Sequence, residues 1–225
     1  MLWRVNPQPE PSFHMIELYT WTTGNGRKPS IALEEMGLAY EIQGVDLAKN
    51  EQYSAEFTLL SPNNKIPAIR DRDTGQTIFE SGAILLYLAE KSGKFLPKDE
   101  AGRWSVIQWL MWQMGGVGPM FGQAMHFIHY NPGASDYAAN RYLTEAKRLY
   151  SVLDRRLGEA AYAAGEDYTI ADMAIWPWVA RHPMQTVDLN EYPNVRRWYV
   201  EIANRPSVQR GWSILGDTSP IPLPG

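Results

Sequence analysis

Two polar side chains, Thr23 and Asn25, lie in a short loop whose neighbours indicate an anion-binding junction. The loop, residues 22–26, follows the strand-like segment 15–21 and directly precedes a helix-like segment that begins at Arg27. The first turn of a helix presents free backbone N–H groups and the positive end of the helix dipole. A Thr hydroxyl and an Asn amide would add two donors, and the combination suits a thiolate as well as a phosphate. Taken alone, the loop is better explained as an ordinary turn in which both side chains cap the helix.

The composition restricts what this loop could bind. The loop has neither the additional glycines nor the Gly-Lys-Ser/Thr ending of phosphate-binding loops, which disfavours a nucleotide. The chain has 225 residues and no cysteine. Disulfides, thiolate metal sites and cysteine nucleophiles are therefore all excluded. Any redox chemistry must use a sulfur atom supplied by a bound molecule.

Charge and histidine placement disfavour other kinds of partner. The chain has 21 Lys and Arg against 25 Asp and Glu, a net charge of −4 at pH 7. Nucleic-acid and anionic-membrane binders concentrate positive charge, so neither partner is expected. His126 and His129 are three residues apart, but no carboxylate or thiol lies near them in the sequence. We therefore predict no metal site.

The elements that must position the loop alternate between strands and helices over the first part of the chain. Hydrophobic periodicity and turn residues predict the order β-α-β-α-β-β-α, with the first two strands parallel and the last two forming a hairpin. The predicted strands are 15–21, 40–47, 66–70 and 77–79, and the predicted helices are 27–37, 53–60 and 81–91.

Beyond a polar stretch at 94–102, the strand patterns stop and helical patterns take over. We predict one helix over 103–114 and then a break at Gly115 to Pro119. A second helical stretch is expected to run to residue 130, and a third helix is expected to begin at Ser135. Thr169 and Asp172 have the spacing of a capping box, in which each side chain bonds a backbone N–H at a helix start.

No signal peptide or membrane span is expected from the first residues or from the apolar runs of the sequence. Residues 1–14 contain Pro7, Pro9 and Pro11 and no apolar stretch typical of a signal peptide. The longest apolar runs, 83–89 and 173–180, fall far short of the roughly 18 residues of a membrane span. A cytoplasmic protein is therefore expected.

Three longer runs resemble a known family. They are Ser61 to Ala68 (SPNNKIPA), Phe79 to Lys91 (FESGAILLYLAEK) and the segment from Trp109 to Met120. These runs resemble glutathione transferases. Within that superfamily they resemble the bacterial Nu class of glutathione-dependent disulfide-bond reductases, which are related to the folded domain of a fungal nitrogen-regulator prion. The likeness covers nearly all of residues 15–212 and has no gaps in its motifs.

The resemblance implies a fold, a ligand and an assembly. It implies α/β plus all-α architecture in a homodimer that binds glutathione, with the bond before Pro67 in cis. The implied divisions are an N-terminal tail at 1–14, a thioredoxin-like glutathione-binding domain at 15–94, a linker at 95–102, an all-helical domain at 103–214 and a C-terminal tail at 215–225.

The resemblance also implies which residues contact glutathione. Asn25 and Thr23 would face its sulfur, and a cation–carboxylate pair and a helix start would hold its γ-glutamyl end. The remaining implied contacts are Glu80 to the ammonium, Ser81 to the carboxylate, the Ile66 backbone to the cysteinyl part, Gln52 and Lys65 to the glycyl end, and Gln108 and Arg141 in the helical domain, with Arg141 serving a second glutathione.

Three functions fit these residues. In the first, the bound glutathione thiolate attacks a disulfide and a second glutathione completes the exchange. In the second, the thiolate is conjugated to an electrophile or reduces a peroxide, with Tyr19 or Thr23 as the donor to sulfur. In the third, the chain is a non-catalytic glutathione-binding regulator, since fold does not fix function. Trp21 and Phe127 are candidates for the co-substrate pocket.

Overall fold

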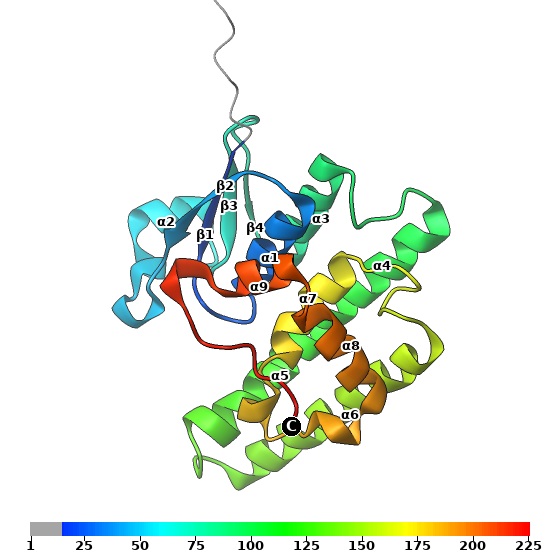
Figure 1. Ribbon diagram of the computed structural model, residues 1–225. Coiled ribbons are helices and arrows are strands. Elements are labelled where there is room, and N and C mark those ends of the chain that lie inside the picture. The colour runs from blue at the N-terminus through cyan, green and yellow to red at the C-terminus, as the bar shows by residue number, and fades with distance from the viewer. Residues whose placement is uncertain (1–14) are drawn as a thin grey trace, which may run out of the picture.

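The computed structural model of the protein describes residues 15–225, which form a small sheet unit and a larger helical unit (Figure 1). The sheet has four strands in the order β2-β1-β3-β4. Strands β1 and β2 are parallel, β3 is antiparallel to β1, and β3 and β4 form a hairpin. The elements of this unit are β1 (Ile16–Thr20), α1 (Arg27–Met36), β2 (Tyr40–Gly44), α2 (Ala55–Leu60), β3 (Ala68–Asp71), β4 (Thr77–Phe79) and α3 (Ser81–Ser92).

The predicted element order of this unit is confirmed. Alternate residues of β1 are buried, as expected of a strand with one face in the core. Helix α1 ends at Gly37, whose left-handed φ of 70° lets its N–H bond the carbonyl of Leu33. The second strand stops at Gly44, earlier than predicted, because the chain then turns through two short 3-10 helices at Leu47–Lys49 and Glu51–Tyr53.

The rest of the described chain is helical. Its helices are α4 (Glu100–Trp112), α5 (Gly118–Met125), α6 (Asp136–Glu159), α7 (Ile170–Val179), α8 (Pro193–Ala203) and α9 (Pro206–Trp212), with shorter 3-10 turns at His182–Gln185, Leu189–Glu191 and Ile214–Gly216. A thioredoxin-like α/β unit followed by an all-helical unit is the predicted fold class, and it is confirmed.

The predicted break at Gly115 to Pro119 is wrong. The chain continues as a π-helical turn, Gln113–Val117, that joins α4 directly to α5, and a second π-helical turn follows at His126–Tyr130. Pro119 lies in the first turn of α5, directly after the π-helical turn. Buried Val117 and Gln113 anchor the π-turn against the core, which outweighs the local preference of the glycines for a break.

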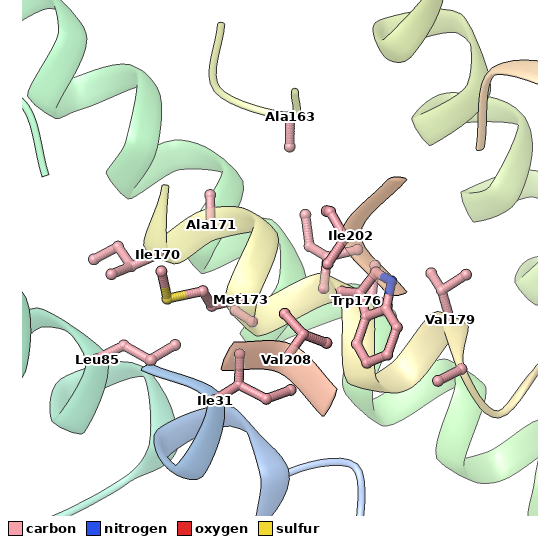
Figure 2. Close-up of a cluster of buried hydrophobic side chains, with 14 of the residues drawn as sticks. Ile31, Leu85, Ala163, Ile170, Ala171, Met173, Trp176, Val179, Ile202 and Val208 are labelled. Atoms are coloured by element: carbon pink, nitrogen blue, oxygen red, sulfur yellow. The ribbon is translucent and has the colours of Figure 1, made fainter. Parts of the chain in front are cut away.

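One hydrophobic cluster spans both units (Figure 2). Ile31 of α1 and Leu85 of α3 lie in this cluster with Met173 and Trp176 of α7 and Val208 of α9. These side chains are almost fully buried. The division of the chain at 95–102 stays a prediction. What the cluster establishes is that the two units share a core, so the relative position of the loop after β1 and helix α7 is fixed by packing.

No helix within residues 15–225 is both long and apolar enough to cross a bilayer. The predicted N-terminal tail, residues 1–14, lies outside the described residues. At the other end, residues 217–225 run extended over the helical unit. The Tyr199 hydroxyl donates to the carbonyl of Pro222 (2.6 Å), and the Trp212 indole donates to that of Ser219 (3.0 Å).

Candidate functional site

A cleft of about 520 Å³ lies where the loop after β1 meets the helical unit. Its volume is in the range of small-molecule sites. The sheet unit and its loops contribute polar groups, and the helical unit contributes an aromatic and apolar wall. The lining residues are Thr22, Thr23, Gly24, Asn25, Leu47, Gln52, Tyr53, Asn63, Asn64, Lys65 and Ile66 on the first side, and Gly122, Met125, Tyr130, Trp178 and Arg181 on the second.

The Thr23 side chain stabilises the turn that leads into α1, but it does not cap the helix itself. Its hydroxyl oxygen accepts from the backbone N–H of Gly26 (3.0 Å), and its carbonyl accepts from that of Arg27 (3.1 Å). The hydroxyl proton is therefore available to donate into the cleft. Gly26 is required here, because a Cβ atom at this position would lie 2.0 Å from the carbonyl oxygen of Trp21.

Asn25 does not cap the helix; it is held by a tryptophan of the helical unit. The Trp178 indole N–H donates to Asn25 Oδ1 at 2.8 Å. This bond fixes which end of the amide is the oxygen, so the Asn25 NH₂ group is left to donate into the cleft. Gly24 packs against the same indole, which a Cβ atom would approach to 3.1 Å. The tight turn and the tryptophan together set the direction of the Asn25 amide.

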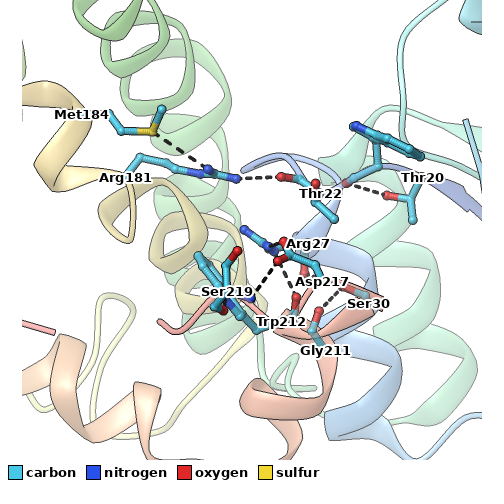
Figure 3. Close-up of polar contacts among 11 residues, drawn as sticks. Thr20, Thr22, Arg27, Ser30, Arg181, Met184, Gly211, Trp212, Asp217 and Ser219 are labelled. Carbon is cyan, nitrogen blue, oxygen red and sulfur yellow. Dashed lines mark hydrogen bonds and ion pairs between the residues drawn. The ribbon is translucent and has the colours of Figure 1, made fainter. Parts of the chain in front are cut away.

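A second long-range contact fixes the other side of the loop (Figure 3). The Arg181 guanidinium donates to the carbonyl oxygen of Thr22 at 2.7 Å. Arg27 donates to the carbonyl of Trp212 and pairs with Asp217, and its guanidinium lies 3.6 Å from the centre of the Trp212 ring. Burial lowers the pKa of Arg181, and it lowers the pKa of Arg27 to about 10. Both guanidinium groups remain cations at neutral pH, so they add positive potential beside the loop.

A smaller cavity of about 60 Å³ continues from the cleft toward the start of α3. Asn25, Lys65 and Ile66 line both spaces, so the two form one path. The far end is lined by Ser61, Pro67, Glu80, Ser81 and Met114. The Ile66–Pro67 peptide bond is cis, as the family resemblance implied. Glu80 has a left-handed φ of 70°, a rare backbone conformation for a non-glycine residue that is common at functional sites.

Seven of the nine predicted site residues lie along this path. They are Thr23, Asn25, Gln52, Lys65, Ile66, Glu80 and Ser81. The Oε1 atom of Gln52 is buried with no hydrogen-bond partner among the described residues, so the cleft wall contains an acceptor for a ligand N–H.

Gln108 and Arg141 do not join the others. Gln108 is exposed on α4 and lines neither cavity. Arg141 is exposed on α6 and lines a separate depression of about 710 Å³ together with Tyr137 and Glu145. Their contacts with glutathione stay predictions.

Three aromatic residues that the sequence suggested for the site do not line the cleft. The Tyr19 hydroxyl donates to Glu17 on the same strand (3.1 Å), and burial raises the pKa of Tyr19, which makes it a poorer donor to a thiolate. Trp21 and Phe127 do not line the cleft, and their roles toward a co-substrate stay predictions. The Trp21 ring lies beside Gly44, and Phe127 stacks on Tyr142.

Sequence reasoning missed the residues that orient the loop. Trp178 and Arg181 lie about 150 positions from the groups they bond, at separations of 153 and 159 residues. No local pattern signals a partnership of that length. Within residues 15–225, no group of three or more His, Cys, Asp or Glu side chains is arranged to hold a metal ion.

Two family profiles match the chain. The profile described as glutathione S-transferase, N-terminal domain, matches residues 15–90, and that described as glutathione S-transferase, C-terminal domain, matches residues 117–206. Among curated relatives, the disulfide-bond oxidoreductase YfcG of Escherichia coli is 50% identical over 198 residues, covering 86% of this chain and 92% of the relative. The disulfide-bond oxidoreductase YghU of the same organism is 41% identical, covering 92% and 77%.

Solved structures with the same fold contain glutathione or its disulfide. A glutathione transferase from Burkholderia graminis, with two glutathione molecules bound per subunit, has a TM-score of 0.85 and 42% identity, covering 92% of this chain and 91% of its own. One from Pseudomonas putida, with one glutathione disulfide bound per subunit, has a TM-score of 0.84 and 44% identity, covering 92% and 95%. These matches confirm the resemblance inferred from the sequence.

Proposed function

We propose that this chain, which belongs to the glutathione S-transferase family, is a glutathione-dependent disulfide-bond oxidoreductase whose reactive sulfur is that of bound glutathione. The observation that carries the proposal is the Asn25 amide, which Trp178 holds with its NH₂ group free at a loop that also offers the Thr23 hydroxyl. With no cysteine in the chain, the reactive sulfur must come from the ligand. The names of the two Escherichia coli relatives and the ligands of the solved structures support the same reaction.

Glutathione fits the path from one end to the other. Its γ-glutamyl ammonium would meet the Glu80 carboxylate and its α-carboxylate would meet Ser81 at the start of α3. The backbone of Ile66, before the cis bond, would pair with the cysteinyl part. Gln52 and Lys65 would hold the glycyl end. In this placement the sulfur lies beside Thr23 and Asn25.

The reaction then proceeds by two exchanges of sulfur. The thiol of glutathione loses its proton, and hydrogen bonds from Asn25 and Thr23 stabilise the thiolate. The thiolate attacks one sulfur of the substrate disulfide, forming a mixed disulfide and releasing the other sulfur as a thiolate. A second glutathione thiolate attacks the glutathione sulfur of the mixed disulfide. Glutathione disulfide forms, the second substrate thiolate is released, and two glutathione molecules have supplied the two electrons.

We also propose that the chain forms a homodimer and works in the cytoplasm. Trp104, Gln108 and Met111 share one exposed face of α4, with Trp104 55% and Met111 48% exposed, and such an apolar face suits a contact with a second copy. The reaction needs a large supply of reduced glutathione, which the cytoplasm maintains. Sedimentation at working concentration is expected to give twice the chain mass of 25.6 kDa.

The test of the reaction compares three measurements on the same preparation. We expect glutathione-dependent reduction of a small disulfide, little conjugation of a chlorinated aromatic, and a fall in disulfide turnover of about 100-fold in Asn25→Ala, the usual loss on removing one donor to a developing anion. Conjugation exceeding disulfide reduction would instead assign the chain to the conjugating transferases. Glutathione binding with neither activity would leave a non-catalytic receptor.

A further inference from the structure

A buried lysine lies directly behind the proposed γ-glutamyl site. Lys28 is in the first turn of α1, and only 1% of it is exposed. Its ammonium donates to Ser81 Oγ at 3.1 Å and to Gln113 Oε1 at 2.6 Å, and the Met114 sulfur is 3.5 Å away. Ser81 and Met114 line the small cavity, whereas Lys28 does not. Lys28 therefore touches that cavity only through its neighbours.

The ammonium has no carboxylate partner among the described residues. Its hydrogen-bond partners among residues 15–225 are Ser81, Gln113 and Met114, and all three are neutral. An unpaired charge in a protein interior is costly. Burial lowers the pKa of Lys28 to about 7, and attraction to the exposed Glu80 carboxylate offsets only part of that effect.

Other charged groups around α1 are engaged elsewhere. Arg205, which precedes α9, pairs with Glu35, and Arg210 of α9 pairs with Glu34. Asp172, the only charged residue of α7, accepts hydrogen bonds from its own helix cap and from Trp198. On the sheet side, Glu17 of β1 pairs with Arg70 and Arg72. On the π-turn after α4, the two groups that meet Lys28 are uncharged.

The hydrogen bond from Lys28 also determines what Ser81 offers to a ligand. Because the ammonium occupies a lone pair of Ser81 Oγ, the hydroxyl proton must point elsewhere. Within residues 15–225 its other partner is the Met114 sulfur, a weak acceptor at 3.7 Å. A ligand carboxylate at the start of α3 would be a far stronger acceptor.

We propose that Lys28 is a positioning residue that supplies a buried positive charge for the α-carboxylate at the γ-glutamyl end of glutathione, acting through Ser81. The inference rests on the proposed glutathione site. The ligand carboxylate supplies the counter-charge that the fold omits, and Lys28 in turn aims the Ser81 hydroxyl at that carboxylate. A negative charge placed at Ser81 favours the ammonium form of Lys28, so ligand binding takes up a proton at pH values where the free lysine is partly neutral.

The decisive probe is S-methylglutathione, whose sulfur cannot ionise. We would measure its binding by titration calorimetry between pH 6 and 8 in buffers of different ionisation enthalpy. Proton uptake is expected to be near zero at pH 6, where Lys28 is already protonated, and to rise toward pH 8. A glutathione analogue whose γ-glutamyl α-carboxylate is replaced by hydrogen is expected to bind with no uptake. Equal uptake with both ligands would overturn the proposal without any variant being made.

Variants then test the residue itself. Lys28→Met is expected to weaken S-methylglutathione binding about 10-fold or more, as for loss of a charged hydrogen bond, and to abolish proton uptake. Its affinity for the analogue should stay as in wild type, which a general packing defect would not allow. Lys147→Met, on the exposed face of α6, is the matched control and should change neither quantity. Equal weakening of both ligands in Lys28→Met would contradict the proposal.

These measurements are separate from catalysis. If the chain binds S-methylglutathione with the expected uptake but reduces no disulfide, the proposed reaction fails and the role of Lys28 stands. If it reduces disulfides but takes up no proton on binding, the reaction stands and the role of Lys28 is overturned.

Discussion

The direction of the Asn25 amide is decided by one hydrogen bond across the two units. An unbound Asn side chain at a loop presents oxygen or NH₂ equally well, and an oxygen facing a thiolate would repel it. The Trp178 indole can only donate, so its contact with Asn25 Oδ1 leaves the NH₂ group for the sulfur. The sequence indicates Asn25 and Thr23 through their residue types at a strand-to-helix junction. It gives no signal for Trp178, because that contact exists only after the units have packed.

We therefore expect Trp178→Phe to impair catalysis more than glutathione binding. The phenyl ring keeps the apolar wall but loses the N–H, so the Asn25 amide can turn and donate to the thiolate only part of the time. Disulfide turnover should fall about 10-fold, in keeping with one lost hydrogen bond, while the dissociation constant of glutathione changes less than about 3-fold. Steady-state kinetics and calorimetry on the same preparation measure both.

The control for that substitution is made in a variant that lacks the Asn25 amide, which is the group that the Trp178 indole holds. In a background of Asn25→Ala, Trp178→Phe should have almost no further effect, because the group that it orients is gone. Turnover in Trp178→Phe that equals wild type would show that the indole does not orient Asn25.

Among the elements, α7 is the one whose start was predicted most fully. The structure confirms the capping box, in which Thr169 Oγ1 accepts from Ala171 N–H and Asp172 Oδ2 accepts from Thr169 N–H. The same carboxylate also accepts from Ala163 N–H and from the Trp198 indole. Local spacing could predict the first pair of bonds, but not the second pair, which come from segments that pack against the helix.

Asp172→Ala should therefore destabilise the protein more than the loss of an ordinary helix cap does. It leaves two buried donors, Ala163 N–H and the Trp198 indole, without an acceptor. The free energy of unfolding should fall by about 2 to 4 kcal/mol, against about 1 kcal/mol for loss of a cap alone. Urea unfolding measures the difference.

The control is Asp136→Ala, which removes an exposed acid from the first turn of α6 but leaves the Ser135 cap in place. That change should cost less than about 1 kcal/mol. A similar loss in the two variants would mean that the additional bonds of Asp172 contribute little.

Helices α8 and α9 were not placed individually, although the buried residues of α8 recur at helical spacing. The two π-helical turns were not predicted, for a physical reason. Periodicity and turn residues report local preference, whereas the π-turn at Gln113–Val117 is held by burial against other helices. The local preference of the Gly and Pro residues there is for an interruption of the helix. Tertiary packing reversed that preference, and the turn places Gln113 where it accepts from Lys28.

In the whole molecule, α9 and α1 pack so closely that the two units should unfold together. A Cβ atom at Gly211 would lie 2.6 Å from Ile31 Cα, and the Ser30 hydroxyl donates to the Gly211 carbonyl at 2.7 Å. The shared hydrophobic cluster continues this contact through α7. The residue patterns identified each unit, but the way the units pack depends on such close approaches, which no single segment encodes.

Gly211→Ala is expected to push α9 away from α1 and to lower the free energy of unfolding by about 1 to 3 kcal/mol, the usual cost of overpacking. Far-UV circular dichroism and tryptophan fluorescence should still give coincident transitions, because the core is shared. Gly115→Ala, where a Cβ atom would meet nothing within 4 Å, is the control and should change stability little. Separate transitions for the two probes in wild type would show that the units unfold independently.

The ionisation of glutathione on the protein tests the central claim most directly. The ultraviolet absorbance of the thiolate, followed as a function of pH with saturating glutathione, gives the pKa of the bound thiol. A free thiol has a pKa of about 8.5, and each pH unit of lowering corresponds to about 1.4 kcal/mol of preference for the anion. The bound thiol of the wild-type protein should ionise below about pH 7, and in Asn25→Ala its pKa should return most of the way to the value in buffer. A bound thiol that ionises at the same pH as in buffer would contradict the claim that the loop after β1 activates the sulfur.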